Sequence, residues 1–82
     1  MRVQILYFAK IRDLIGKAEE VLVLPESVTK LSDLVGYLTN LHPVLEGRLG
    51  SVRLARNETF ASLTEPVADG DTIALIPPVA GG

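Results

Sequence analysis

The sequence contains no cysteine. This absence excludes disulfide bonds, zinc sites built on cysteine and a cysteine nucleophile. Long apolar runs are also missing: the longest covers residues 5–9, far too short for a membrane span or a signal segment. Lysine and arginine form no block, and the net charge is −2, so a nucleic-acid partner is not expected. We therefore expect a soluble, cytoplasmic protein that binds neither nucleic acid nor membrane.

The chain is also short. Its 82 residues suffice for one domain with a modest core. A deep pocket would hollow out that core, so an independent enzyme with a walled active site is a poor hypothesis. The composition is that of a folded protein, with 48% apolar and 22% charged residues. A module that presents a surface or a tail to a larger partner is the better expectation.

Five segments carry the apolar pattern of β-strands. Residues 2–8 alternate at first and then become apolar on both faces, which is typical of a central strand. Residues 20–24, closed by Pro25, predict a second strand that pairs antiparallel with the first. The remaining strands are predicted at residues 52–56, 59–63 and 72–76, with turns at residues 57–58 and 69–71.

Two segments show helical spacing. Residues 9–15 predict a short helix that stops at Gly16. A longer helix is predicted to begin at Thr29 or Ser32, either of which suits an N-cap, and to end at Pro43. Its predicted buried stripe is formed by Leu31, Leu34, Val35, Leu38 and Leu41. This order of elements predicts an α+β fold of the ubiquitin-like β-grasp type, a mixed sheet with one main helix packed across it.

Few side chains suit catalysis or metal binding. His42 is the only histidine, and it lies at the predicted C-terminus of the main helix, where a cation favours the helix dipole. No second ligand or base is near it in the sequence. Glu19 and Glu20 are interpreted as a solvated strand entry, and Asp69 and Asp71 as turn residues. We therefore predict no metal site and no cofactor bound by this chain.

The C-terminal tail is the most distinctive segment. Residues 77–82 read PPVAGG, carry no charged side chain and follow the last predicted strand. Two prolines cannot join a sheet and favour an extended exit, whereas glycines allow the backbone to enter a narrow slot. A frayed terminus is the alternative interpretation. We predict a domain over residues 1–76 and an extended tail over residues 77–82 that projects its carboxylate into a partner.

Three segments, in order along the chain, resemble one protein family. Residues 7–16, YFAKIRDLIG, are similar to the FFAxxRELxG signature of molybdopterin synthase small subunits. Residues 56–58 resemble the Val-Asn turn of that family, and residues 69–71 with 77–82 resemble its DGD-to-PPVxGG ending. The departures are Asp13 in place of the usual Glu, and Leu75 and Ile76 where the family often has aromatic residues.

The resemblance implies a sulfur carrier whose working group is the C-terminal carboxyl of Gly82. An adenylyltransferase of the ubiquitin-activating type would activate this carboxyl with ATP, and a sulfur donor would convert it to a thiocarboxylate. The thiocarboxylate would then donate sulfur to cyclic pyranopterin monophosphate in molybdenum cofactor biosynthesis. Gly81 and Ala80 would enter the active site of the large synthase subunit with it. Catalytic side chains would belong to the large subunit, so this chain would be the sulfur-donating subunit of a sulfurtransferase complex.

The apolar character around the tail suggests which residues bind that partner. Leu75, Pro77, Pro78 and Val79 are the predicted anchors, and Phe8 and Arg12 are further candidates. Phe8 also fits a core position, because it ends a strand that is apolar on both faces. The resemblance implies a heterotetramer of two small and two large subunits. Two alternatives remain: a sulfur carrier for thiamine or tRNA thiolation, and a ubiquitin-like protein modifier or a plain interaction domain.

Overall fold

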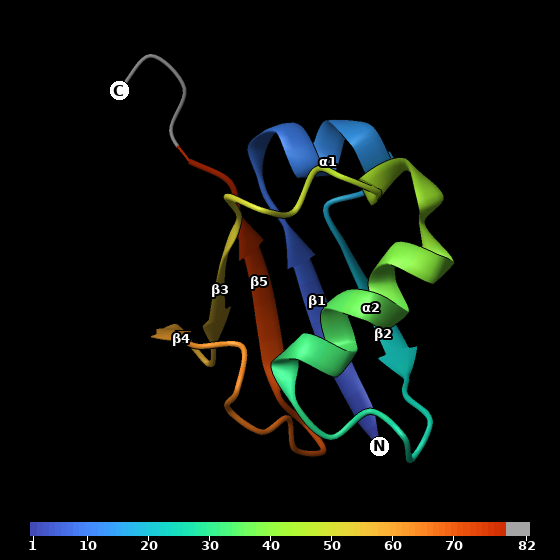
Figure 1. Cartoon of the computed structure of the whole chain (residues 1–82), viewed down its shortest axis with the longest axis vertical. Helices are drawn as coiled ribbons and strands as arrows, with labels where there is room; N and C mark the ends of the chain where they lie inside the picture. Colours follow the sequence, from blue (N-terminus) through green and yellow to red (C-terminus); the bar gives the residue numbers. More distant parts are fainter. Residues whose placement is uncertain (79–82) are drawn as a thin grey trace.

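The computed structural model describes residues 1–78 and shows a five-stranded mixed sheet crossed by one main helix (Figure 1). The predicted ubiquitin-like β-grasp fold is thereby confirmed. Its sheet order is β2-β1-β5-β3-β4, in which β1 and β5 are parallel and the other neighbours are antiparallel. The elements are β1 (Arg2–Tyr7), α1 (Ala9–Ile15), β2 (Glu19–Val23), α2 (Leu31–Leu41), η1 (Pro43–Leu45), β3 (Arg53–Arg56), β4 (Thr59–Ala61) and β5 (Thr72–Ile76).

The core lies between α2 and the sheet. Strand β1 is central in the sheet, as predicted, and its alternate residues Val3, Ile5 and Tyr7 are buried and pack with the buried face of α2. Each leucine buried in this way stabilises the fold by about 1.5–3 kcal/mol. Leu41 was predicted to belong to this buried stripe, but its side chain is 43% exposed. It lies in the last turn of α2, where the helix ends at His42.

The end of α1 and the start of α2 each have a clear local cause. Gly16 adopts a left-handed conformation with φ of 87°, and its N–H donates to the Arg12 carbonyl at 2.8 Å, so α1 stops where predicted. The prediction for the start of α2 was wrong, because Lys30 is its N-cap. The carboxylate of Asp33 accepts hydrogen bonds from the backbone N–H groups of Thr29 and Lys30, both at 3.1 Å. These bonds lower the pKa of Asp33.

Two of the sequence signatures form one turn structure at the end of the sheet opposite the tail. The Asn57 side chain donates to Asp71 at 2.9 Å and accepts from the backbone N–H of Thr72 at 2.9 Å. Asp69 accepts from the backbone N–H of Arg2 at 2.7 Å, which ties the same turn to β1. The Asn57 turn and the Asp-Gly-Asp turn therefore fix how β3, β5 and β1 meet.

A polar cluster joins β1, β2 and the end of α2. The Glu20 carboxylate accepts a hydrogen bond from the Tyr7 hydroxyl and lies 2.6 Å from Nε2 of His42. The interpretation of Glu20 as a solvated strand residue was therefore wrong, since 14% of its side chain is exposed. Partial burial works to raise the pKa of Glu20, but the hydrogen bonds from Tyr7 and His42 outweigh it and the pKa lies below the usual value.

Some element boundaries differ from the prediction by one or two residues. β1 ends at Tyr7 rather than at residue 8, because Phe8 is the N-cap of α1. β2 is shifted to Glu19–Val23, and β4 ends at Ala61. Within residues 1–78, no helix is long and apolar enough to cross a membrane.

Candidate interaction surface at the tail exit

The strand β5 carries the chain from the core to the tail. It ends at Ile76, and Pro77 and Pro78 follow outside the sheet beside α1 (Figure 1). Leu75, predicted as a partner anchor, is fully buried with 0% exposure and is part of the core. Its side chain is therefore not available to a partner in the folded protein. Ile76 is half-buried, because successive strand residues point to opposite faces of the sheet.

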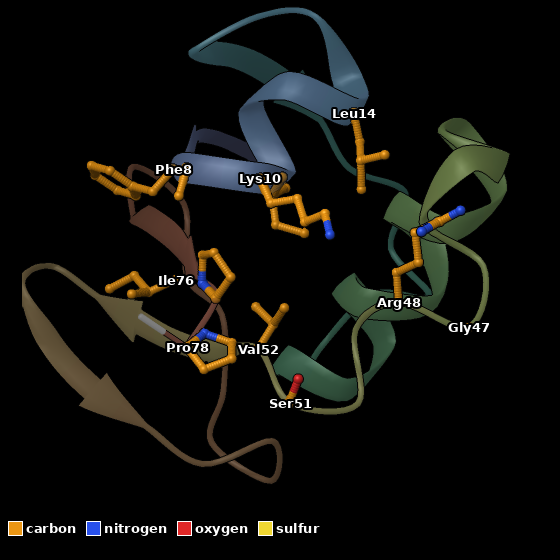
Figure 2. Close-up of a pocket in the computed structure, with 12 residues that line it drawn as sticks. Phe8, Lys10, Leu14, Gly47, Arg48, Ser51, Val52, Ile76 and Pro78 are labelled. Atoms are coloured by element: carbon orange, nitrogen blue, oxygen red, sulfur yellow. The ribbon is translucent and has the colours of Figure 1, made fainter. Parts of the chain in front are cut away.

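Phe8 lies beside this exit. Tyr7 pairs with Leu75 in the parallel β1–β5 ladder, so the next residues, Phe8 and Ile76, are neighbours on the face opposite α2. The Phe8 side chain is 45% exposed, which shows that the core interpretation of this residue was wrong. Figure 2 shows Phe8 and Ile76 next to each other where the chain leaves the sheet. Phe8 is thus accessible to a partner that approaches the tail.

Two further residues extend this surface across the sheet. Arg53 pairs with Ile76 in the β3–β5 ladder, and its guanidinium lies 3.8 Å from the centroid of the Phe60 ring. This distance is typical of a cation–π contact, and the Phe60 side chain remains 53% exposed. We call Phe8, Ile76, Arg53 and Phe60 the tail-exit patch. Aromatic and arginine side chains at one place on a surface are the types that dominate protein interfaces.

The sequence did not identify three members of this patch. Ile76, Arg53 and Phe60 lie on three different strands, and only the register of the ladders brings them together. The alternation of residues 53–56 together with a short return strand was the available signal, because it places Phe60 opposite Ala55. Without the strand order, however, Arg53 and Phe60 could not be assigned to the part of the sheet beside the tail.

A groove opens on the other side of the tail exit. It has a volume of about 900 Å³ and lies between α1 and residues 47–52 (Figure 2). We call it the α1 groove. Pro77 and Pro78, two of the predicted anchors, line it together with Phe8 and Ile76. Arg12, also predicted to bind the partner, is exposed on α1 but does not line the groove.

The remaining predicted site residues are those of the tail itself. Val79, Ala80, Gly81 and Gly82 lie outside the described residues, so their predicted roles stay predictions. Among residues 1–78, no group of three or more histidine and acidic side chains could hold a metal ion. What the described part of the site offers is an apolar and cationic surface on both sides of the point where the tail begins.

Comparison with known proteins identifies the family of this chain. The sequence model described as the ThiS family matches residues 5–82, which includes the tail. The chain belongs to the ThiS family. Since the match begins in β1 and runs to Gly82, the family relationship covers both the fold and the diglycine ending.

Proteins similar to this chain include sulfur carriers and a small archaeal modifier protein, SAMP1. The molybdopterin synthase sulfur carrier subunit of Aedes aegypti is 42% identical, covering 100% of this chain and 90% of the relative. The structure of SAMP1 from Haloferax volcanii superimposes with a TM-score of 0.88 at 28% identity, covering 100% of both chains. A complex of subunits 1 and 2 of the molybdopterin-converting factor from Helicobacter pylori contains a chain with a TM-score of 0.70 at 28% identity, also covering 100% of both.

These ThiS-family relatives confirm the resemblance to molybdopterin synthase small subunits that the sequence signatures indicate. The coverage is informative, because the relatives are hardly longer than this chain. The sheet and the two helices that position the tail exit therefore lie in the region that this chain shares with those relatives.

Proposed function

We propose that this chain is the sulfur carrier subunit of a molybdopterin synthase, and that its sulfur travels on the C-terminal acyl group of Gly82. The observation that carries the proposal is the full-length match to sulfur carrier subunits, 42% identical in the case of Aedes aegypti. The chain supplies no other group for sulfur chemistry. It has no cysteine, and the only sulfur atom in its sequence is the thioether of a single methionine.

The chemistry follows from the weakness of a carboxylate as an electrophile. An adenylyltransferase would join the Gly82 carboxylate to the α-phosphate of ATP and release pyrophosphate, so that AMP becomes a good leaving group. A persulfide would attack the acyl carbon and expel AMP, which leaves an acyl disulfide. A thiol would then cleave the S–S bond and leave the thiocarboxylate. Gly82 suits these attacks because it has no Cβ beside the acyl carbon.

The tail-exit patch is the proposed docking surface for the large synthase subunit. A partner that takes the tail into its active site must approach the end of the sheet where Pro77 and Pro78 follow the central strand β5. Phe8 and Phe60, 45% and 53% exposed, would be covered by this approach, and aromatic anchors of this kind supply much of the binding energy of an interface. Within the complex, the thiocarboxylate would donate its sulfur to cyclic pyranopterin monophosphate, and two such deliveries would complete a dithiolene.

A second candidate function is conjugation to proteins. The similarity to SAMP1 from Haloferax volcanii, with a TM-score of 0.88, favours this alternative. Both functions begin with the same activated glycine and differ in the acceptor, a sulfur-accepting pterin in one case and a lysine amine in the other. A carrier for another thiolation pathway would differ only in the enzyme that receives the thiocarboxylate.

One experiment separates these functions. The full chain is incubated with the adenylyltransferase, ATP and a sulfur donor, and its intact mass is measured. We expect a gain equal to the mass difference between sulfur and oxygen, localised to the C-terminal peptide. Addition of the large subunit and cyclic pyranopterin monophosphate should return the original mass and produce a dithiolene. Isopeptide adducts on protein lysines without any dithiolene would overturn the proposal in favour of the modifier.

A further inference from the structure

The α1 groove has an apolar interior beside the tail exit. The buried side chain of Ile11, 2% exposed, closes it on the side of α1. Leu14 of α1 and Val52 of the loop between η1 and β3 are both half-buried and line the groove. Figure 2 shows Leu14 above and Val52 below this space. A concave site of about 900 Å³ with a mostly apolar lining has the dimensions of places where proteins bind another molecule.

Two cations border the same groove. Lys10 extends from α1 toward the opposite side, where Arg48 projects from the loop (Figure 2). Both residues are exposed, and the ion pairs found within residues 1–78 include neither of them. The nearest acidic residues in the sequence, Asp13 and Glu46, do not line the groove. The groove is thus a local cationic site on a chain whose net charge is −2.

The groove and the tail-exit patch are continuous. Phe8 and Ile76 belong to the patch and also line the groove, and Pro77 and Pro78 lie between the two surfaces. A protein that holds the tail and covers the patch therefore reaches one wall of the groove without any rearrangement. If that partner left the groove empty, apolar surface and two cations would remain at the edge of the interface without complementary groups.

We propose that the α1 groove receives an apolar segment of the large subunit that carries at least one acidic side chain. This inference rests on the proposed function and adds a second contact to it. An apolar side chain of the segment would lie between Leu14 and Val52, and its carboxylate would lie between Lys10 and Arg48. Opposite charges at the edge of an interface direct docking and fix its orientation. The contact would set the angle at which the tail enters the large subunit.

Charge reversal tests this proposal. We would titrate the large subunit with the full chain and with the variant Lys10→Glu/Arg48→Glu, using calorimetry. We expect the Kd to rise by roughly tenfold to a hundredfold for the variant, because like charges would face the acidic segment. The affinity of the unmodified chain should fall with added salt, whereas the affinity of the variant should rise, because salt screens attraction in the first case and repulsion in the second. Exchange of the two cations, Lys10→Arg/Arg48→Lys, should preserve most of the binding.

The matched control is Arg2→Glu/Lys30→Glu, which makes the same change of charge at the other end of the sheet. It should bind like the unmodified chain, and thermal unfolding of every variant establishes that each one is folded. Unchanged binding by the groove variant would overturn the proposal. A variant that binds the large subunit normally but is poorly adenylated would also overturn it and assign the groove to the activating enzyme. So would self-association of the chain that the variant abolishes.

The proposed function fails in a different way. If the unmodified chain does not bind any large subunit and gains no sulfur, the proposed function is wrong and the groove contact is wrong with it. If the unmodified chain gains sulfur and binds, while the groove variant binds equally well, only the groove contact is wrong. The two outcomes are therefore distinguished by the behaviour of the unmodified chain.

Discussion

Nε2 of His42 lies 2.6 Å from Oε2 of Glu20, although the two residues are 22 positions apart in the sequence. This contact fastens the end of α2 to the edge strand β2. The same carboxylate accepts a hydrogen bond from the hydroxyl of the buried Tyr7 on β1. Burial, reinforced by the Glu20 carboxylate, raises the pKa of Tyr7 well above its ordinary value of 10.0. One acidic side chain therefore holds three elements together, and its ionisation bears on stability.

The first prediction is that Glu20 stabilises the protein in a manner that depends on pH. Its pKa in the folded state lies below the ordinary value of 4.5, so the unfolded chain binds the proton more tightly. The stabilisation is present above the unfolded pKa and is lost as the pH falls through the folded pKa. We expect Glu20→Gln to be less stable than the unmodified protein by about 1–3 kcal/mol at neutral pH.

Urea unfolding at a series of pH values measures this effect. The difference in unfolding free energy between the two proteins should shrink as the pH falls below 4.5, the ordinary value for this carboxyl. Glu19→Gln is the matched control. Glu19 is the exposed neighbour of Glu20, and its side chain accepts a hydrogen bond only from Gln4, at 3.3 Å, among the residues that the structure describes. A difference for Glu20→Gln that does not vary with pH would contradict the assignment.

The second prediction concerns the turn between β3 and β4. Asn57 and Glu58 have φ values of 51° and 71°, so both lie in the left-handed region. A two-residue hairpin turn with this geometry favours Asn followed by Gly, and a residue with a Cβ is strained there by about 1–2 kcal/mol. We expect Glu58→Gly to raise the free energy of unfolding by about 0.5–1 kcal/mol, after the greater entropy of glycine in the unfolded chain is deducted.

Thermal or urea unfolding of Glu58→Gly provides the measurement. Gly70→Ala is the converse control, because it introduces a Cβ at a φ of 87° and should lower the stability. A Glu58→Gly protein that unfolds more easily than the unmodified chain would show that the side chain of Glu58 contributes more than its backbone strain costs.

The sequence predicted the local features of the fold well. Alternation at the start of β1 matched its buried residues Val3 and Ile5, the apolar run at residues 6–8 indicated its central place in the sheet, and Gly16 was correctly identified as the end of α1. Helical periodicity was wrong at Leu41, which is 43% exposed in the last turn of α2, because the spacing of apolar residues does not show where a helix stops packing on the core. The N-cap of α2 was also wrong, because Asp33 supplies the capping oxygen from inside the helix.

Contacts between distant segments were beyond the reach of the sequence. Glu20 and His42 carry no local signal of their contact, because it depends on the packing of α2 over β2. The same holds for Lys10 and Arg48, which border one groove only because α1 lies against the loop after η1. The tail was different, since its composition and the family resemblance pointed to it directly. For that reason the sequence identified the proposed chemistry better than it identified the surface around it.

The third prediction concerns the tail-exit patch. Phe60→Ala should weaken binding of the large subunit by about tenfold or more, because an exposed aromatic anchor would be lost. Leu63→Ala is the matched control, since Leu63 is also about half exposed at 52% but lies outside the patch. Calorimetric titration with both variants measures the effect. Equal weakening by the two substitutions would indicate that general apolar surface, rather than the patch, determines the affinity.

The fourth prediction concerns Gly82 itself. Deletion of Gly82 should abolish sulfur transfer without changing the melting temperature, because a chain terminus beyond β5 contributes little to the core. Addition of one residue after Gly82 should be equally damaging, since it displaces the reacting carboxyl by about 3.5 Å. Gly81→Ala should be milder than the deletion but still harmful, because its side chain would have to pass through the channel that admits the tail.

Dithiolene formation and intact mass after activation provide the two measurements for these tail variants. The mass gain of sulfur for oxygen should be absent in the protein that lacks Gly82, and binding to the large subunit through the tail-exit patch should persist at reduced affinity. This combination separates the chemistry of the tail from the docking of the domain, because only the tail carries the acyl group and only the domain carries Phe8 and Phe60. A protein without Gly82 that still supported dithiolene formation would show that sulfur travels elsewhere, and the proposed function would then be wrong.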